Sequence, residues 1–429
     1  MSDQIWPKET LGGLFDIGAG KAMSPSARLG ERTYPFLRTA NVFWGEVDLT
    51  KLDTMNFSEG EIEYKSLKKG DLLICEGGDI GRSAIWQGEV EKCGFQNHIH
   101  RLRPKTPDVV PAFFMYYLQA GFTQLGIYEG AGNKTTIPNL SRGRLAVLEV
   151  PNPPKPEQEK ISAMLWKIQR AIQIEEKLTA TANDLKRSAM RQLFTCGLRG
   201  EPQKETDIGQ IPKSWDVQPL EKKREFLQYG TSLKCGYTKK GNPVIRIPNI
   251  MDGRVSCDDL KWCEFSEREI ESLALEPGDV LFIRTNGVRD RVGTCAVYRG
   301  KPERALFASY LIRARLKTDE LDPSFFQYFT ATAAGLAQLG GQASPAADGK
   351  FNVNTKTIDS VLVPLPDPDE QKEIAAIMQT IDRKISVHER KRAALSDLFQ
   401  TMLNQLMTAQ IRVDKLDIDT REVTALNPQ

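Results

Sequence analysis

Residues 151–161 read PNPPKPEQEKI, and residues 364–374 read PLPDPDEQKEI. The two stretches lie 213 residues apart (374 − 161) and share prolines, a Glu-Gln pair and the closing isoleucine. Prolines hold the preceding chain extended, and the positive end of a helix dipole favours acidic residues such as Glu157, Asp369 and Glu370 in the first turn. Each stretch therefore predicts a helix start, and the repetition predicts two copies of one unit.

The first copy also contains part of another known pattern. Asn152, Pro153 and Pro154 are three of the four residues of the Asn-Pro-Pro-aromatic site of adenine-N6 methyltransferases. Lys155 stands where that site needs an aromatic ring to stack on a flipped adenine, and the second copy has Leu365 in place of Asn152. The stretch therefore favours a helix start over a methylating active site.

The duplication extends well beyond these two stretches. Apolar alternation and turn glycines recur between residues 34–45 and 242–253, 69–74 and 277–282, 80–86 and 292–298, and 113–117 and 325–329. The polar residues between these anchors differ. We therefore expect one scaffold used twice, with exposed loops that serve different targets.

Short β-branched and aromatic runs bounded by glycine predict strands in both copies. The expected strands are 71–75, 83–86, 98–102, 280–283, 294–298 and 311–316. Residues 111–120 and 323–334 are apolar, begin with proline and predict helices packed on the sheet. Each copy is therefore expected to be a mixed α/β domain of about 150 residues.

A long helical pattern follows each copy. Between Glu157 and Thr195 there is neither proline nor glycine, and apolar residues recur at helical spacing: Ile161, Leu165, Ile168 and Ile172, then Leu178, Leu185 and Leu193. The second pattern contains Ile374, Met378, Ile381, Ile385, Leu395, Met402 and Leu406, with His388 and Arg392 interrupting the same seam. Because a lone helix with one apolar stripe is unstable in water, we expect the two helices to pair antiparallel, about an approximate two-fold axis.

Composition limits the class of protein. A chain of 429 residues that is 40% hydrophobic is globular, and its net charge of +2 excludes a generally basic, DNA-coating protein. Residues 281–317 are an exception, with nine lysines or arginines against Asp290 and Glu303. The start lacks the pattern of a secretory signal and no long apolar run follows, so we expect a cytoplasmic protein without a membrane span.

The cysteines indicate a reducing environment. Seven are present, at residues 75, 93, 196, 235, 257, 263 and 295, and no two form a Cys-x-x-Cys pair. An odd and scattered set fits small, reduced, buried side chains better than a disulfide framework or a zinc site.

This ordered set of features, found twice, resembles the DNA-specificity subunit of type I restriction-modification systems. The likeness covers nearly the whole chain. It includes the stretch Ile208-Gly-Gln-Ile-Pro-Lys-Ser-Trp215 before the second domain, and a shorter version of this stretch, Ile5-Trp-Pro, lies at the amino terminus. It implies a non-catalytic subunit that reads a bipartite sequence in double-stranded DNA, one half per domain. It also implies two methyltransferase subunits that bind S-adenosylmethionine, and restriction/motor subunits that use ATP and magnesium, with no cofactor on this chain.

The expected fold class is α/β, with two similar mixed α/β target-recognition domains separated by two long antiparallel coiled-coil helices. The expected divisions are a first recognition domain at 1–150, a central long helix at 151–196, a linker at 197–214, a second recognition domain at 215–363, a C-terminal long helix at 364–408 and a loosely ordered tail at 409–429.

Recognition of a DNA sequence needs hydrogen-bond donors of fixed geometry on loops or strand ends. Arginine or lysine donates to guanine, and asparagine or glutamine bonds to adenine. The candidates in the first domain are Lys21, Ser24, Arg28, Arg38, Asn41, Arg82 and Lys134. Those in the second are Lys234, Lys239, Lys240, Arg246, Asn249, Arg284, Asn286, Arg289 and Arg291. For each residue alone a solvated charge or turn former is the competing interpretation, whereas for the group 284–291 DNA contact is favoured. Asn41 and Asn249 occupy matching positions, which favours scaffold turns.

Three other patterns carry weaker signals. Gly18-Ala-Gly-Lys21 lacks the spacing of a phosphate-binding loop. His98 and His100 alternate on a strand, but the second copy has Tyr310 and Ile312 there, so packing and a hydrogen bond are favoured over a metal site. The glycine loop 130–136 is either a flexible turn or a phosphate contact.

Large apolar residues lie off the main seam of the first long helix, at Met164, Trp166, Ile174, Met190 and Phe194. They predict either docking of the methyltransferase subunits or packing of the recognition domains back onto the helix.

Two functions from other classes remain as alternatives. A self-contained adenine-N6 methyltransferase would need a glycine-rich cofactor loop after a strand and the aromatic that the Asn-Pro-Pro stretch lacks. A coiled-coil scaffold with two unrelated binding modules accounts for the helices but not for the basic stretch or the paired domains.

Overall fold

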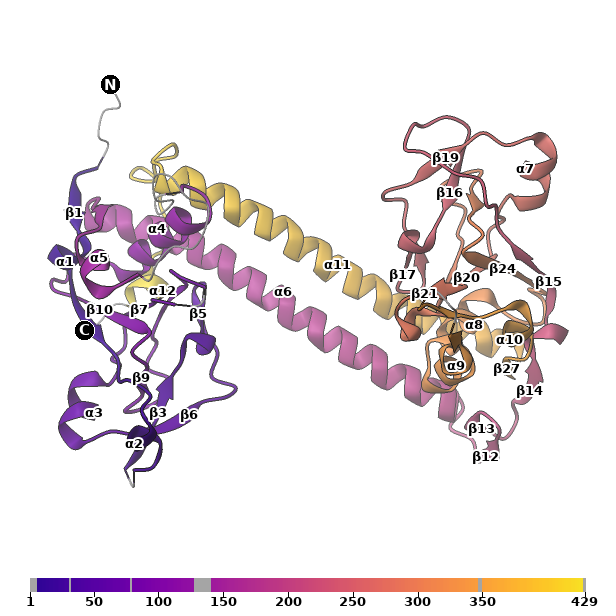
Figure 1. Cartoon of the computed structure of the whole chain (residues 1–429), viewed down its shortest axis with the longest axis horizontal. Coiled ribbons are helices and arrows are strands. Elements are labelled where there is room, and N and C mark those ends of the chain that lie inside the picture. The colour runs from indigo at the N-terminus through magenta and orange to yellow at the C-terminus, as the bar shows by residue number, and fades with distance from the viewer. Residues whose placement is uncertain (1–5, 31, 78, 127–139, 346–348, 427–429) are drawn as a thin grey trace. The chain divides into compact units, whose positions relative to one another are not determined.

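The computed structural model describes residues 6–30, 32–77, 79–126, 140–345 and 349–426. The chain divides into two compact units, which we call unit 1 (Met1–Lys177 with His388–Gln429) and unit 2 (Leu178–Val387). Both long helices therefore contribute to both units (Figure 1). Within the described residues, none of the helices combines the length and apolarity that a membrane crossing requires.

Unit 1 is a mixed α/β domain joined to one end of the helix pair. Its main sheet has the antiparallel order β2-β10-β7-β8, and a smaller sheet has the order β6-β3-β9. Its elements are β1 (Lys8–Thr10), α1 (Leu11–Leu14), β2 (Phe15–Ala19), α2 (Pro25–Arg28), β3 (Thr33–Leu37), β4 (Val42–Phe43), β5 (Glu46–Val47), β6 (Asp53–Asn56), α3 (Glu59–Lys65), β7 (Leu72–Cys75), β8 (Ser83–Ile85), β9 (Gly94–Phe95), β10 (Ile99–Pro104), α4 (Pro111–Thr123), α5 (Arg142–Ala146), β11 (Glu149–Pro151), and parts of α6 (Lys155–Cys196) and α11 (Pro368–Met407), followed by α12 (Arg421–Thr424).

Unit 2 repeats this plan. Its main sheet has the order β15-β24-β20-β22-β18-β17, and the smaller sheet has the order β19-β16-β23. Besides its parts of α6 and α11, its elements are β12 (Gln203–Thr206), β13 (Gly209–Pro212), β14 (Asp216–Pro219), β15 (Arg224–Tyr229), β16 (Asn242–Ile245), β17 (Ile250–Met251), β18 (Arg254–Val255), β19 (Lys261–Cys263), α7 (Glu267–Leu273), β20 (Val280–Ile283), β21 (Thr285–Asn286), β22 (Cys295–Val297), β23 (Leu306–Phe307), β24 (Leu311–Leu316), α8 (Pro323–Thr330), α9 (Ala333–Gln338), β25 (Ser344–Pro345), β26 (Phe351–Asn352), α10 (Thr355–Asp359) and β27 (Leu362–Leu365).

The fold class predicted from the sequence is confirmed, and the predicted strands lie within about two residues of those observed. The correspondence reaches the local helix signals, since α3 and α7 both begin with a capping box, Ser58 with Glu61 and Ser266 with Glu269. Gly45 and Gly253 both adopt positive φ, at 70° and 78°. Both are turn glycines, as their repetition predicted.

A buried ion pair holds the same two strands together in each unit. In unit 1 the Asp71 carboxylate accepts two hydrogen bonds from the Arg103 guanidinium, both at 2.7 Å. In unit 2 Asp279 accepts two from Arg315, at 2.8 and 2.9 Å. Both aspartates are buried. The repeated Gly-Asp pair at 70–71 and 278–279 is therefore structural.

The repeated Glu-Gln pair joins each long helix to its domain. Glu157 is buried and accepts hydrogen bonds from the indole of Trp6 at 3.1 Å and from Arg412 at 2.7 Å. Glu370 is equally buried and accepts from the indole of Trp215 at 3.3 Å and from the backbone N–H of Leu198 at 2.9 Å. The contacts explain why this stretch decides the fold: it fastens a helix start to a domain twice.

The neighbouring glutamines serve the helix that covers each sheet. The Gln158 side chain accepts a hydrogen bond from Val110 N, at the start of α4, at 2.9 Å. The Gln371 side chain accepts one from Asp322 N, at the start of α8, at 2.8 Å. Each glutamine also donates to proline carbonyls in the stretch before its own helix, which leaves its buried amide satisfied.

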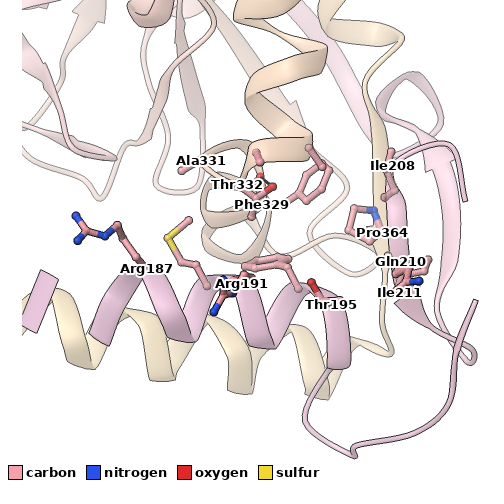
Figure 2. Close-up of a pocket in the computed structure, with 14 residues that line it drawn as sticks. Arg187, Arg191, Thr195, Ile208, Gln210, Ile211, Phe329, Ala331, Thr332 and Pro364 are labelled. Carbon is pink, nitrogen blue, oxygen red and sulfur yellow. Dashed lines mark hydrogen bonds between the residues drawn. The ribbon is translucent and has the colours of Figure 1, made fainter. Parts of the chain in front are cut away.

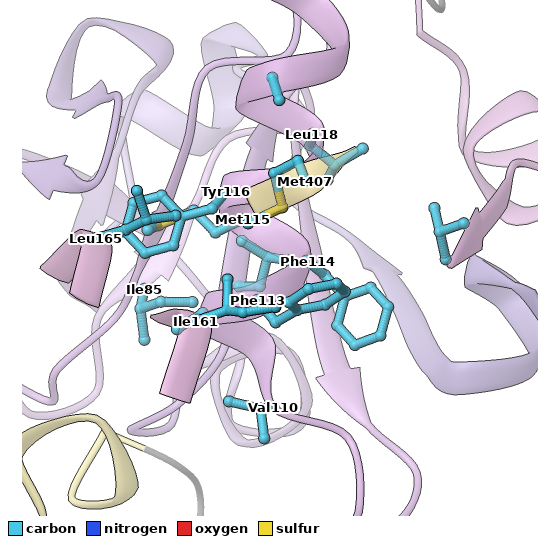
Figure 3. Close-up of a cluster of buried hydrophobic side chains, with 14 of the residues drawn as sticks. Ile85, Val110, Phe113, Phe114, Met115, Tyr116, Leu118, Ile161, Leu165 and Met407 are labelled. Atoms are coloured by element: carbon cyan, nitrogen blue, oxygen red, sulfur yellow. The ribbon is translucent and has the colours of Figure 1, made fainter. Parts of the chain in front are cut away.

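Each core lies between a sheet, its covering helix and the long helices. In unit 1, Phe113, Phe114 and Tyr116 of α4 are fully buried among Ile161 and Leu165 of α6, as Figure 3 shows. In unit 2, Phe325 and Phe329 of α8 pack against Phe194, with ring centroids 5.1 and 6.1 Å away.

The long helices run antiparallel in each unit, as predicted. Glu175 of α6 contacts His388 of α11 at 2.7 Å, and further along α6 Lys186 contacts Asp382 at 2.7 Å. The apolar seam is shorter than predicted, because Leu178 is 41% exposed and Leu185 is 53% exposed. Near these positions the helices are joined by charged pairs instead.

Two connecting segments also differ from expectation. The linker at 197–214 contains the hairpin β12–β13. The tail was expected to be loosely ordered, but Val413 and Val423 are fully buried in the core of unit 1. Short apolar residues spaced along a mixed-charge segment gave no periodic signal that would have predicted this packing.

Candidate nucleic-acid interface

At one end of strands β15, β20 and β24 of the main sheet in unit 2, an arginine lies beside exposed aromatic rings. We call this end of the strands, with Tyr229, Arg284 and Tyr310, the Arg284 edge. Arg284 follows β20, and its guanidinium lies 4.9 Å from the ring centroid of Tyr229, the last residue of β15. The same guanidinium donates to the carbonyl of Ser309, at 3.4 Å, next to Tyr310. Tyr229 is 40% exposed and Tyr310 is 57% exposed. Rings and a planar cation in this arrangement suit stacking on bases and contact with phosphates.

A short turn beside this edge holds two more arginines. Arg289 donates to the carbonyls of Gly340 and Gly341, at 3.2 and 2.8 Å, and its guanidinium lies 5.7 Å from the Phe351 ring centroid. Arg291 is exposed, and no partner for its guanidinium is found among the described residues. In this turn, the Arg289 guanidinium is therefore held by protein carbonyls, whereas the Arg291 guanidinium is exposed to solvent. Asn286, just before it, caps the turn by accepting a hydrogen bond from Val288 N at 2.9 Å.

Residues 230–241, which we call the lysine loop, lie next to the Arg284 edge. Thr231 N donates to Phe307 O at 2.9 Å, and Ser309 N donates to Thr231 O at 2.7 Å. Lys234 and Lys239 are exposed, and Lys240 forms an exposed ion pair with Glu264 at 3.0 Å. The lysine loop thus adds exposed positive charge next to the Arg284 edge.

The basic stretch 281–317 is smaller in space than in sequence. Arg313 is buried, lies 3.6 Å from Asp279 and donates to the carbonyl of Ala274 at 2.7 Å, and burial lowers its pKa. Arg315 is held by Asp279, and Lys301 pairs with Glu303. The nine basic residues therefore do not form one continuous patch, because acidic side chains neutralise part of the stretch. Arg284, Arg289 and Arg291 remain on the surface loop.

The corresponding edge of unit 1 has different chemistry. The strand register places Ala19, Glu76 and His98 where unit 2 has Tyr229, Arg284 and Tyr310. Nearby Lys21 forms a 2.6 Å ion pair with Glu61, and the hydrogen bond from Lys21 lowers the pKa of that carboxyl. Two copies of one scaffold therefore present different polar groups at the same place.

Two further candidates of unit 1 are partly committed to protein contacts. Arg82 donates to Thr39 O at 3.1 Å and lies 3.2 Å from Asp79. The Ser24 hydroxyl caps α2 by accepting from Ala27 N at 3.2 Å. Arg28 ends α2, and Lys134 lies outside the described residues.

The two matched asparagines do not reach the surface. Asn41 accepts from Arg38 N at 2.9 Å and donates to the carbonyls of Asp48 and Lys51, both at 3.0 Å. Asn249 accepts from Arg246 N at 2.9 Å and donates to Asp258 O at 2.7 Å. Because both are buried with their amides satisfied, the structure favours the scaffold interpretation over DNA contact for them.

The arginines that precede these asparagines are held in ion pairs. Arg38 contacts Asp53 at 2.8 Å, and Arg246 contacts Asp259 at 2.9 Å. Their carboxylate partners compete with a DNA phosphate for the same guanidinium groups.

The two histidines have separate environments. His100 is buried, its Nε2 lies 2.9 Å from the carbonyl of Leu140, and burial lowers its pKa. His98 is exposed. Within the described parts of the chain, no group of three or more His, Cys, Asp or Glu side chains could hold a metal ion.

The predicted partner-binding residues are largely used by the domains themselves. Met164 and Trp166 pack against the core of unit 1, and Phe194 is buried in that of unit 2. The Phe194 ring packs against Phe325 and Phe329, and docking at this residue stays a prediction. Ile174 stays 47% exposed.

Met190 and Phe194 line a cavity of about 410 Å³ in unit 2, between α6, α8, α9 and β13 (Figure 2). Phe329, Ile208 and Ile211 form apolar parts of its wall, and Arg187 and Arg191 stand on the α6 side. The cavity leaves apolar surface open beside the long helix.

Sequence reasoning did not select Tyr229 and Tyr310. Tyr229 is the last residue of β15 and is followed by Gly230, and Tyr310 directly precedes β24. For Tyr229, an aromatic residue at a strand end beside a glycine was the available signal.

Comparisons with known proteins agree with this architecture. The sequence profile of the family described as type I restriction modification DNA specificity domain matches residues 4–183 and 212–397. The EcoKI type I restriction enzyme specificity subunit of Escherichia coli is 26% identical over 424 residues, covering 91% of this chain and 86% of that protein. The putative type I restriction enzyme MjaX specificity subunit of Methanocaldococcus jannaschii is 28% identical over 206 residues, and the matched part is 48% of each protein.

Among solved structures, the type I restriction-modification S subunit from M. genitalium has a TM-score of 0.61 at 16% identity, covering 95% of this chain and 97% of that one. This likeness concerns the fold.

Proposed function

Because this chain belongs to the type I restriction-modification DNA specificity family, we propose that it reads a bipartite sequence in double-stranded DNA, one half per domain. It has no catalytic activity of its own in this proposal. The observation that carries the proposal is the contrast between the two units: their buried ion pairs and helix contacts repeat, whereas the sheet edges differ.

The contrast predicts two different half-sites. Unit 2 offers Arg284, Arg289 and Arg291 beside two exposed tyrosines, while unit 1 has exposed His98 and Glu76, 14% exposed and 3.7 Å from His100, at the same position. Arginine donates bidentately to guanine, and glutamate accepts from the amino group of cytosine. A non-palindromic target follows from this difference in chemistry.

Within unit 2, we assign each basic residue to a base contact or a phosphate contact according to whether protein contacts hold its side chain. Arg284 is held by Tyr229 and the Ser309 carbonyl, which gives its guanidinium a defined direction suited to a base edge. Lys234 and Lys239 are exposed on the lysine loop and suit phosphate contacts, which position the protein without reading sequence. Arg291 is also exposed, and the following experiment distinguishes a base contact from a phosphate contact for this residue.

The experiment compares Arg291→Ala with Arg268→Ala, an exposed arginine on α7 away from β21 (Figure 1). Binding of the assembled methyltransferase complex to target and non-target DNA is measured by fluorescence anisotropy over a range of salt. Loss of one base contact costs about 1–3 kcal/mol for the target only. Loss of one phosphate contact weakens both DNAs and reduces the salt slope by about one. If Arg291→Ala and Arg268→Ala behaved alike on both DNAs, the proposed interface would be wrong.

Partner subunits complete the proposed function. The chain recruits two methyltransferase subunits that bind S-adenosylmethionine, and restriction/motor subunits that use ATP and magnesium, and it acts in the cytoplasm. Exposed Leu185 on α6, together with the cavity beside α6 in unit 2, supports docking of the methyltransferase there.

Leu185→Glu tests this docking, because Leu185 is exposed, whereas Trp166 packs against the core of unit 1. Leu416→Glu is the control, because Leu416 is similarly exposed but lies outside the long helices. Size-exclusion chromatography with the methyltransferase should show loss of the complex for Leu185→Glu alone. An intact complex with Leu185→Glu would show that α6 does not dock the partner at this position.

A further inference from the structure

Cys235 and Cys263 lie opposite each other on neighbouring extended segments. Gly236 N donates to Trp262 O at 3.0 Å, and Trp262 N donates to Gly236 O at 2.7 Å. These two residues form an antiparallel bridge in which both hydrogen bonds are exchanged. The next pair outward, Cys235 with Cys263, therefore occupies a non-hydrogen-bonded position, where Cα atoms are about 4.5 Å apart.

Contacts on both sides of the bridge agree with this register. On the other flank the Lys261 ammonium lies 4.9 Å from the ring centroid of Tyr237. On the cysteine side, burial and the adjacent Cys263 thiol, within hydrogen-bonding reach, raise the pKa of Cys235 to about 11. Gly241 passes so close to the Cys263 carbonyl oxygen that an added Cβ would lie 2.2 Å from it. The lysine loop is therefore packed against the strand that bears Cys263.

The geometry suits a disulfide. Disulfides span Cα separations of about 4.4–6.8 Å and need side chains that point to the same side, which directly opposed residues on paired strands provide. Both cysteines are free and half-buried, so a small oxidant can reach them. Their sulfurs make only weak contacts, with Leu233 O at 3.4 Å and Glu264 O at 3.7 Å.

We propose that Cys235 and Cys263 form a redox-responsive pair that closes to a cross-strand disulfide and fastens the lysine loop to β19. With a glutathione disulfide as oxidant, the Cys263 thiolate attacks one of its sulfurs and releases a glutathione thiolate. The Cys235 thiolate then attacks the Cys263 sulfur of the mixed disulfide and releases the second glutathione. The protein loses two protons and two electrons, and the glutathione disulfide is reduced to two thiols.

Proximity favours the second, intramolecular step, because the two thiols already lie within hydrogen-bonding reach of each other. Closure is expected within seconds to hours, the range of thiol–disulfide exchange.

A consequence for DNA binding rests on the function proposed above. The lysine loop carries Lys234, Lys239 and Lys240. Fastening it to β19 changes how far these ammonium groups reach toward phosphate oxygens, and therefore changes the affinity for DNA in general more than the preference for one sequence.

The test treats the full chain with glutathione disulfide and maps its peptides under non-reducing conditions. The wild type should yield a peptide pair joined through Cys235 and Cys263, with the loss of two hydrogen atoms, reversible by dithiothreitol. Cys235→Ser and Cys263→Ser should not yield it. Cys257→Ser is the matched control, because Cys257 is an exposed cysteine of the same domain and its removal should leave the cross-link unchanged.

Stable glutathione adducts on Cys263 without closure, or pairing through Cys257, would overturn the proposal. Peptide mapping needs no DNA, so it separates this proposal from the proposed function. If the disulfide forms but neither the oxidised nor the reduced complex binds DNA, the function fails and the redox pair stands.

Discussion

Removal of the Glu370 carboxylate should selectively destabilise unit 2. Glu370 is 4% exposed and accepts hydrogen bonds from Trp215 Nε1 and Leu198 N, at 3.3 and 2.9 Å. Hydrogen bonds to a charged group contribute about 1.5–3 kcal/mol each, and the longer one belongs at the low end, so Glu370→Ala should cost about 3–4.5 kcal/mol. For a unit of 150–250 residues this lowers Tm by about 6–18 °C.

Asp369→Ala is the control for this prediction. Asp369 stands next to Glu370 in the same first turn and carries the same charge, but its side chain is 98% exposed. Its loss removes the interaction with the helix dipole, about 0.3–1 kcal/mol, and an exposed 3.9 Å ion pair with Lys372, which contributes about 0–1 kcal/mol. Differential scanning calorimetry of the full chain measures both variants, and Glu370→Gln should lie between them. Equal Tm values for Glu370→Ala and Asp369→Ala would refute the role given to the repeated Glu-Gln pair.

Three further outcomes follow from the same structure. Asn249→Ala should lower the free energy of unfolding by about 2 kcal/mol in urea titrations, because Arg246 N and Asp258 O lose their side-chain partner. The recognised DNA sequence should stay unchanged, and a changed sequence would return Asn249 to the interface. Hydrogen bonds from Lys391 and His388 lower the pKa of Glu175 from 4.5. The stability they contribute is present above this value and lost as pH falls through the folded pKa, so Glu175→Gln should flatten the acid side of the urea-midpoint profile, and an unchanged profile would contradict the assignment. Gly253→Ala should be destabilised by more than about 1 kcal/mol in urea titrations, because φ is 78° and the added Cβ would lie 2.3 Å from Gln327 Nε2; wild-type stability would show that the turn relaxes freely.

The elements were predictable because their signals are local. Glycine-bounded β-branched runs predicted strands such as β20 and β24, and the absence of proline and glycine predicted α6 and α11. The repeat added information that a single copy does not contain. Asn41 and Asn249 occupy matching positions in the two copies, which favoured a scaffold role before their burial was known.

The surface was less predictable because partners come from distant strands. Arg315 and Arg284 look alike in the sequence, and only the pairing of β20 with β24 places Asp279 against Arg315. The lysine loop folds along β19 and brings Cys235 to Cys263, residues that showed no paired spacing. Leu185 fits the helical period but is exposed, because the charged pair of Lys186 with Asp382 joins the helices there.

The central claim is that each domain reads its own half of one DNA target. The most direct test is methylome sequencing of a host that expresses this chain with a type I methyltransferase subunit, before and after residues 215–363 are exchanged for the corresponding domain of another family member. The account predicts a bipartite adenine-methylated motif of which only one half changes on exchange. A motif that persists unchanged would place the specificity in another subunit and leave this chain as a scaffold.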